Sequence, residues 1–203
     1  MKYHVAALFG VCLCLSLTTT NAQADKKESD ANKAKEAKVE TLVVKIAGLE
    51  LKLPKTWQKK AESARSIRKA TYEVKPVKGE TDKAELTMFN FPNQDIKQNI
   101  DRWVGQFQSK GRKSTTTKGK CSTGEYYLVD ASGIFKKPVP GSPPRLGKTT
   151  DAPGYRMLAV ILPVEGKGMY FLKLTGPEKT VAAQAKAFRG SFGGNKKEET
   201  ELK

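Results

Sequence analysis

Two short apolar strands joined by a tight turn are predicted at residues 42–53, which read LVVKIAGLELKL. The turn falls at residues 47–48. Leucine alternates with charged residues in the later strand, the period of two that is typical of a half-buried strand. These leucines are Leu49, Leu51 and Leu53. Pro54 is predicted to end the strand, and Trp57 is expected to enter the core.

Two more strands are predicted at residues 66–77 and 84–91, separated by a polar turn at residues 78–82. Their apolar positions are Ile67, Tyr72 and Val74, then Leu86, Met88 and Phe89. A helix is expected to follow, capped by Asn93 and ended by Gly111. Its apolar residues share one helix face: Ile96, Ile100, Trp103, Val104 and Phe107.

The second half of the chain is predicted to be mostly strand. Residues 113–120 are polar and threonine-rich, which suits an exposed strand or a loop, and residues 125–135 are apolar and β-prone. Residues 155–163 and 169–174 form a hairpin pattern across the glycines of residues 165–168.

A last helix is predicted to begin at a capping box, Thr175 to Glu178, and to run to about Arg189. Its apolar face holds Val181, Ala185 and Phe188. The order of strands, helix, strands and helix predicts an α+β fold in which a mainly antiparallel sheet is covered by helices.

Three signatures of this architecture stand out: LKLPKTW ending at Trp57, DRW at residues 101–103 before Phe107, and FLKLTGP at residues 171–177 before a helix ending at Phe188. Together they resemble the PsbP-like family over residues 42–192. The resemblance implies an exported PsbP-like α/β/α sandwich with an accessory or binding role. It supplies no catalytic motif and assigns no partner-binding residue.

The N-terminus predicts export. Residues 1–24 have a basic start, an apolar stretch of about 13 residues and small residues at Ala22 and Ala24, as a cleavable signal peptide does. A transmembrane anchor is the alternative, but the stretch is too short for a bilayer core. We therefore expect a periplasmic or extracellular protein with no transmembrane span after cleavage.

The predicted domain order follows from this processing and from charge. Residues 25–41 are expected to form a charged disordered linker or a frayed helix, and residues 195–203 a disordered charged tail. Residues 42–194 would form the PsbP-like α/β domain, which is long enough to bury a core.

The residue types that remain after cleavage exclude several chemistries. The chain's single histidine, His4, leaves with the signal peptide, and Cys121 is the one cysteine that stays. Ser-His-Asp and Cys-His arrangements and histidine-containing zinc sites are therefore excluded. Cys121 is interpreted as incidental or buried, with an intermolecular disulfide as the alternative. No catalytic residue, cofactor or metal site is predicted.

Two motif-like segments do not carry their usual functions. Gly147-Lys148-Thr149 resembles the end of a phosphate-binding loop, but Pro143 and Pro144 lack the amide hydrogens that would hold phosphate, so ATP binding is not expected. Ser66 and Lys69 match a penicillin-recognition pattern without its companion motifs. Ser66 and Lys69 are interpreted as surface residues of a strand.

Positive charge is the remaining feature, since the formal net charge is +16. A long loop is predicted at residues 136–154. Its candidate anion-binding residues are Lys136, Lys137, Arg145 and Lys148. Such a patch attracts cell-wall polymers, lipid headgroups or nucleic acid. The alternative is that lysine serves solubility alone.

The sequence therefore favours an exported, non-enzymatic binding or accessory domain of unknown ligand, with an unknown protein as its partner. The alternative is a basic surface protein that binds an anionic polymer. A third and weaker hypothesis is a hydrolase that uses carboxylates, because carboxylate pairs can act without histidine.

Overall fold

The computed structural model describes residues 39–64, 66–139 and 147–202. The predicted signal peptide, most of the predicted linker and Arg145 lie outside these residues. The elements are β1 (Thr41–Ile46), β2 (Leu49–Pro54), β3 (Gln58–Lys59), β4 (Ala70–Val74), β5 (Ala84–Phe91), α2 (Ile96–Val104), β6 (Lys113–Cys121), β7 (Gly124–Pro138), β8 (Thr149–Val164), β9 (Gly168–Pro177), α3 (Glu178–Ser191), the 3₁₀ helix η2 (Lys196–Glu198) and β10 (Thr200–Glu201).

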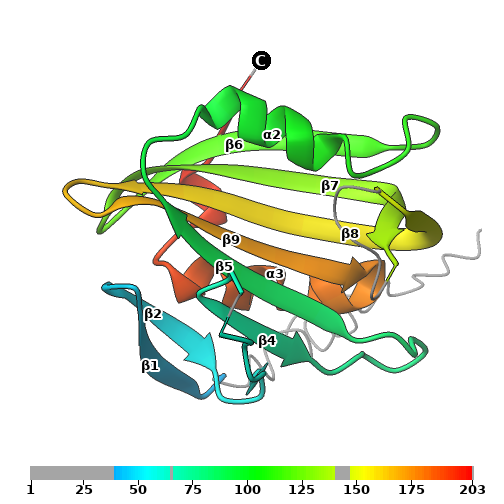
Figure 1. Cartoon of the computed structure of the whole chain (residues 1–203), viewed down its shortest axis with the longest axis horizontal. Helices are drawn as coiled ribbons and strands as arrows, with labels where there is room; N and C mark the ends of the chain where they lie inside the picture. The colour runs from blue at the N-terminus through cyan, green and yellow to red at the C-terminus, as the bar shows by residue number, and fades with distance from the viewer. Residues whose placement is uncertain (1–38, 65, 140–146, 203) are drawn as a thin grey trace, which may run out of the picture. The chain divides into compact units, whose positions relative to one another are not determined.

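Eight strands form one antiparallel sheet in the order β10-β6-β7-β8-β9-β5-β4-β3 (Figure 1). The hairpin β1–β2 forms a separate two-stranded sheet. Its turn is tight because Ala47 and Gly48 both have positive φ, at 48° and 87°, as hairpins of this length require. The predicted mainly antiparallel α+β fold is confirmed at this level.

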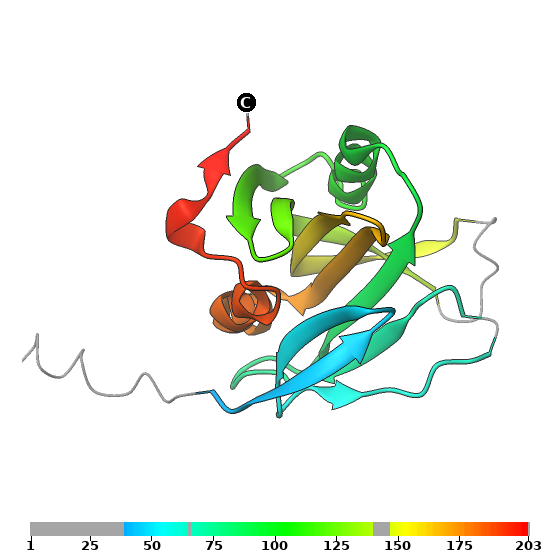
Figure 2. The ribbon, with the colours of Figure 1, turned by 90° about the vertical axis from the view of Figure 1, so that its left-hand side faces the viewer.

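The two faces of the large sheet are covered by different elements (Figure 2). On one face α3 and the β1–β2 hairpin pack over a core that includes Leu51, Leu53 and Trp57, all buried as predicted. On the other face α2 packs through Trp103, whose ring meets Phe171 of β9 edge-on at 6.0 Å. The sheet is therefore the middle layer between two unlike covers.

Helix α2 is shorter than predicted and is capped at other residues. Asp95, not Asn93, is the N-cap, since its carboxylate accepts from the backbone N–H of Gln98 at 2.7 Å. The helix ends at Gly105, not at Gly111. Phe107 is buried but lies beyond the helix, where it forms a β-bridge with Phe135. The bridge to the sheet replaces a further helical turn.

The start of α3 is also capped differently. Thr175 belongs to β9, and Pro177 at the helix start makes no side-chain cap, so the predicted capping box is wrong. Glu80 takes that role from the turn before β5. Its carboxylate accepts from the backbone N–H groups of Lys179 at 2.9 Å and Thr180 at 2.8 Å. A residue about a hundred positions away in sequence thus satisfies the free donors of this helix.

Three strand predictions change in extent. The strand predicted at residues 66–77 is confined to Ala70–Val74, and Ile67 is 68% exposed. Strands β7 and β8 continue into the loop predicted at residues 136–154, with Pro138 paired to Thr149. This continuation carries Lys136 and Lys137 on a strand rather than on a loop.

The tail predicted to be disordered is ordered over residues 195–202. After η2, β10 pairs with β6 at Thr200 and Glu201. The strand pairing at this edge and the buried ion pair of Glu199 stabilise the segment despite its high charge. The charge pattern alone did not reveal these tertiary contacts.

Candidate functional site: a basic pocket on the open face of the sheet

A pocket of about 700 Å³ lies on the sheet face that α2 covers only in part. Helix α2 has nine residues. Trp103, near its C-terminal end, packs against Phe171 of β9. Beyond it the face continues through Lys173 and Thr175 of β9 and Thr87 of β5, which line the pocket. The short helix therefore leaves an uncovered hollow over a central part of the sheet.

Lys173 lies on the floor of this pocket. Strand β9 alternates, so Lys173 shares its face with Phe171 and Met169, while Leu172 and Leu174 enter the core on the other face. Its Nζ donates to Oε1 of Gln106 at 3.1 Å. Gln106 is itself held in place, because its carbonyl accepts from the backbone N–H of Lys136 at 2.8 Å.

The surroundings of Lys173 disfavour its charged form. Burial, followed by the positive charges of Arg68 and Arg102, lowers the pKa of Lys173 to about 8, although Glu85 acts in the opposite direction. Glu85 instead pairs with Arg68 at 3.1 Å and Lys60 at 3.6 Å. Among the described residues, no carboxylate forms an ion pair with Lys173.

Basic side chains from separate segments converge on the same pocket. They are Arg68, Lys83, Arg102, Lys136, Lys137 and Lys173, and among the described residues Glu85 is the one acidic member of the lining. Two acids at the margin offset part of this charge: Glu73 pairs with Lys83, and Asp82 pairs with Lys137 at 3.1 Å. The pocket keeps an excess of positive charge, which favours an anionic ligand.

The pocket also offers apolar and hydrogen-bonding surface. The rings of Phe135 and Tyr155 stack with centroids 5.8 Å apart, and Phe89 adds a third aromatic ring to the lining. The hydroxyl oxygen of Thr175 is buried and has no hydrogen-bond partner within the described residues. A buried polar group without a partner is costly.

Lys137 of β7 and Tyr155 of β8 form part of the rim of the pocket. Lys137 donates to Asp82 and to the hydroxyl of Tyr155 at 3.2 Å. The hydrogen bond from Tyr155 and the contacts with Lys137 lower the pKa of Asp82. A β-bulge between Gly133 and Phe135 precedes this rim, and bulges commonly redirect side chains beside functional sites.

The structure does not bring together all four candidate anion-binding residues predicted from the sequence. Lys136 and Lys137 line the pocket, and Lys136 also donates to the carbonyl of Gly105 at 3.0 Å. Lys148 is exposed ahead of β8 and is not part of the lining. Arg145 lies outside the described residues. The structure thus unites two of the four with basic residues that the sequence analysis did not single out.

Lys173 is the most informative of the residues that were missed. It interrupts an apolar strand, Met169 to Leu174, in which its neighbours are buried. A lysine at such a position was the available signal, since lysine is seldom buried without a partner. The sequence did not predict that Arg68 and Arg102 lie near Lys173, because their segments lie far apart along the chain.

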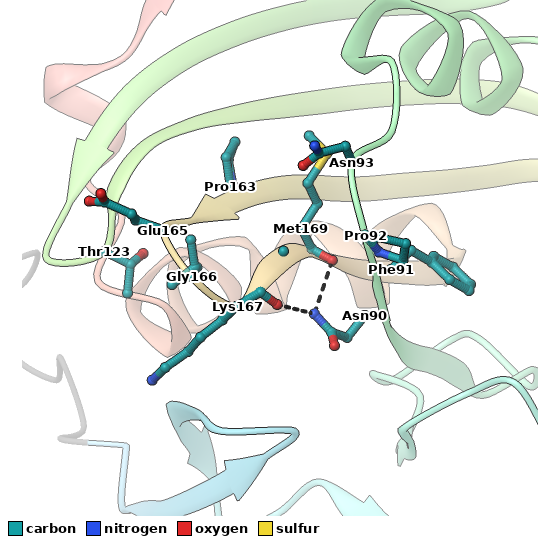
Figure 3. Close-up of a pocket in the computed structure, with 12 residues that line it drawn as sticks. Asn90, Phe91, Pro92, Asn93, Thr123, Pro163, Glu165, Gly166, Lys167 and Met169 are labelled. Carbon is teal, nitrogen blue, oxygen red and sulfur yellow. Dashed lines mark hydrogen bonds between the residues drawn. The ribbon is translucent and has the colours of Figure 1, made fainter.

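A second hollow of about 770 Å³ lies beside the β8–β9 turn (Figure 3). Asn90 makes hydrogen bonds within this hollow. The side-chain amide of Asn90 donates to the carbonyls of Lys167 at 3.0 Å and Met169 at 3.4 Å, as the dashed lines show. It lacks a converging set of charges, so the Lys173 pocket is the stronger candidate.

Residues 39–64, 66–139 and 147–202 contain no cluster of three or more histidine, cysteine, aspartate or glutamate side chains suited to a metal ion. No helix within them is long and apolar enough to cross a membrane. Comparison of the chain with protein-family models and with curated proteins gave no match.

Proposed function

We propose that the protein is an exported, non-enzymatic binding protein whose ligand is a small organic anion held in the Lys173 pocket. One observation carries this proposal. A lysine that pairs with no carboxylate among the described residues lies on the floor of a pocket whose lining is basic on several sides. Positive charge gathered in a partly buried site is costly without a counter-charge, and a bound anion would supply one.

The lining also favours a particular kind of anion. A volume of about 700 Å³ suits a small molecule. The rings of Phe89, Phe135 and Tyr155 provide an apolar wall, while the basic groups lie around it. The best match is a molecule with an apolar or aromatic body and a carboxylate.

The proposal includes a family and a location. We propose that the domain is a PsbP-like sandwich, supported by its antiparallel sheet with helices on opposite faces and by the sequence signatures. Export is supported by the signal-peptide pattern of residues 1–24. An accessory role would then depend on ligand binding rather than on turnover.

An anionic polymer remains the second candidate, and exposed Lys148 beside the rim is the observation that favours it. A polymer would contact the exposed rim lysines and would leave the floor of the pocket unused. Its affinity should fall steeply with salt, as it does when many ionic contacts are made together.

The test is calorimetric titration of the purified protein with benzoate, beside titration with polyglutamate at low and physiological salt. We expect benzoate to bind and Lys173→Met to weaken its binding at least about tenfold, a loss of about 1.4 kcal/mol. Lys52→Met is the matched control, since Lys52 is an exposed residue of β2 outside the pocket. Benzoate binding that is absent or insensitive to Lys173→Met would overturn the proposal, and salt-steep polyglutamate binding alone would support the polymer.

A further inference from the structure

We propose that Lys173 captures its ligand covalently: its neutral amine condenses with the aldehyde or ketone carbonyl of an organic acid bound in the pocket, forming an imine. This inference rests on the proposed anion-binding function and deepens it. It names the ligand class as a carboxylic acid that carries a second, reactive carbonyl group.

The position of Nζ suits this reaction. Lys173 extends from the sheet floor into a pocket large enough for the acid, and Gln106 Oε1 holds Nζ through one accepted hydrogen bond at 3.1 Å. An amide oxygen accepts an N–H hydrogen and leaves the lone pair of a neutral amine free for attack. A carboxylate partner would instead stabilise the ammonium form, and the described residues place none in an ion pair with Lys173.

The charges that face Lys173 keep the amine reactive. Arg102 from α2 and Arg68 from the segment before β4 oppose its protonation, and Glu85 of β5 partly counters them. Lys83, Lys136 and Lys137 complete the basic lining. With a pKa of about 8, about a tenth of the Lys173 amine is neutral at pH 7. Desolvated lysines beside other cations are the ones that form imines.

The bond changes balance without an added oxidant or reductant. The nitrogen lone pair forms a C–N bond to the carbonyl carbon, and the carbonyl oxygen takes up a proton to give a carbinolamine. The carbon–oxygen bond then breaks, and the two amine hydrogens leave with that oxygen as water. Hydrolysis reverses the step, so capture is reversible and needs no turnover.

The remaining lining would hold the rest of the ligand. The guanidinium groups of Arg68 and Arg102 carry the donors that pair with a carboxylate. The aromatic residues favour an aryl or alkyl body over a bare oxo acid.

The experiment uses 4-formylbenzoate, which carries a carboxylate and an aldehyde on one ring, with benzoate as the analogue without the carbonyl. The purified protein is incubated with a substoichiometric amount of the aldehyde and with cyanoborohydride, which reduces an imine to a stable secondary amine. Peptide mass spectrometry then locates the adduct. At pH 7 we expect Lys173 to be labelled at least about tenfold faster than Lys52, with a rate that rises toward pH 8, and excess benzoate to suppress this labelling.

Lys173→Arg removes the amine that would form the imine, so the adduct at this position should be lost. Lys52→Arg, at an exposed residue outside the pocket, is the matched control and should leave the labelling of Lys173 unchanged. If wild-type protein binds benzoate but the aldehyde labels Lys173 no faster than Lys52, covalent capture is wrong and the anion-binding function stands. If benzoate does not bind and labelling is uniform, both proposals fail. Rapid labelling of Lys173 without benzoate binding would contradict the anion-binding function and, with it, the assignment of the captured ligand as a carboxylic acid.

Discussion

Arg189 of α3 and Glu199 form a paired ion bridge, with Nε–Oε1 at 2.7 Å and Nη2–Oε2 at 3.1 Å. Their side chains are only 8% and 3% exposed. Tyr126 and Thr117 also donate to this carboxylate. The pair therefore fastens the C-terminal segment to α3, β6 and β7.

Replacing Glu199 with Gln should destabilise the fold, because it leaves Arg189 buried without its counter-charge. Loss of one partner of a buried pair costs about 3–5 kcal/mol, which denaturant unfolding would measure. Asp101→Asn is the control, since its pair with Lys97 is exposed and an exposed ion pair contributes little to stability. Equal effects of the two substitutions would contradict a stabilising role of the buried Arg189–Glu199 pair.

The same carboxylate should make stability depend on pH. Burial alone would raise the pKa of Glu199, but the hydrogen bond and charge of Arg189, with Thr117 and Tyr126, lower it overall. Its contribution is therefore present above the unfolded pKa of about 4.3 and is lost as pH falls through the folded pKa. Unfolding measured between pH 6 and 3 should show a smaller decline in Glu199→Gln than in the wild type.

Lys173→Met should stabilise the protein at pH 7 while it weakens ligand binding. The lowered pKa means that the folded state holds the Lys173 proton less tightly than the unfolded chain does. The cost of the charged lysine, on the order of 1–3 kcal/mol, is complete below pH 8. Thermal unfolding at fixed pH measures the gain, and a less stable Lys173→Met would contradict this account.

The pH profile of the wild type gives an independent check. Between pH 8 and about 10.5 the folded protein has released the Lys173 proton while the unfolded chain still binds it. The contribution of Lys173 to stability therefore rises with pH in that window. The difference in stability between Lys173→Met and the wild type should shrink across it, and a constant difference would show that Lys173 is not responsible.

Glu80→Gln should weaken the start of α3. Burial raises the pKa of Glu80, but hydrogen bonds from Thr180 and the backbone of Lys179 and Thr180 outweigh that effect and lower the pKa. A cap of this kind is worth about 1 kcal/mol. Unfolding at pH 7 should show a loss of this size, and the loss should shrink as pH falls and the wild-type carboxylate is protonated.

Two glycines should respond in opposite ways to alanine. A Cβ at Gly119 would lie 2.5 Å from the Tyr126 ring, whereas nothing lies within 4 Å of one at Gly190 in α3. Gly119→Ala should cost about 1–3 kcal/mol, because the buried ring has to move. Gly190→Ala should gain about 0.5–1 kcal/mol from helix propensity. Denaturant unfolding of both variants tests the packing under β6.

The export prediction has a direct readout. When the full chain is produced in a secreting host, we expect cleavage after Ala24, which leaves Asp25 at the N-terminus. Intact-mass spectrometry of the exported product identifies the cut, and Ala24→Leu should block it because the peptidase site accepts small residues. Export of an uncleaved wild-type chain would favour the alternative of an anchored segment.

Local patterns were sufficient for most elements, because each depends on neighbouring residues. The alternation of Leu49, Leu51 and Leu53 specified a half-buried strand, and the glycines between residues 163 and 169 specified the β8–β9 hairpin. Element ends were less accurate. The termini of α2 and α3 depend on Asp95 and on distant Glu80, and the latter contact exists only after the chain folds.

Only part of the candidate site could be predicted from the sequence. The basic character of residues 136–137 was visible in the chain, and so was a lysine within the apolar strand at Lys173. Only the tertiary structure set them around one pocket with Arg68 and Arg102, because a short α2 leaves that area of the sheet uncovered. Periodicity determined which face each strand buries, while the meeting of distant charges depended on how the layers pack.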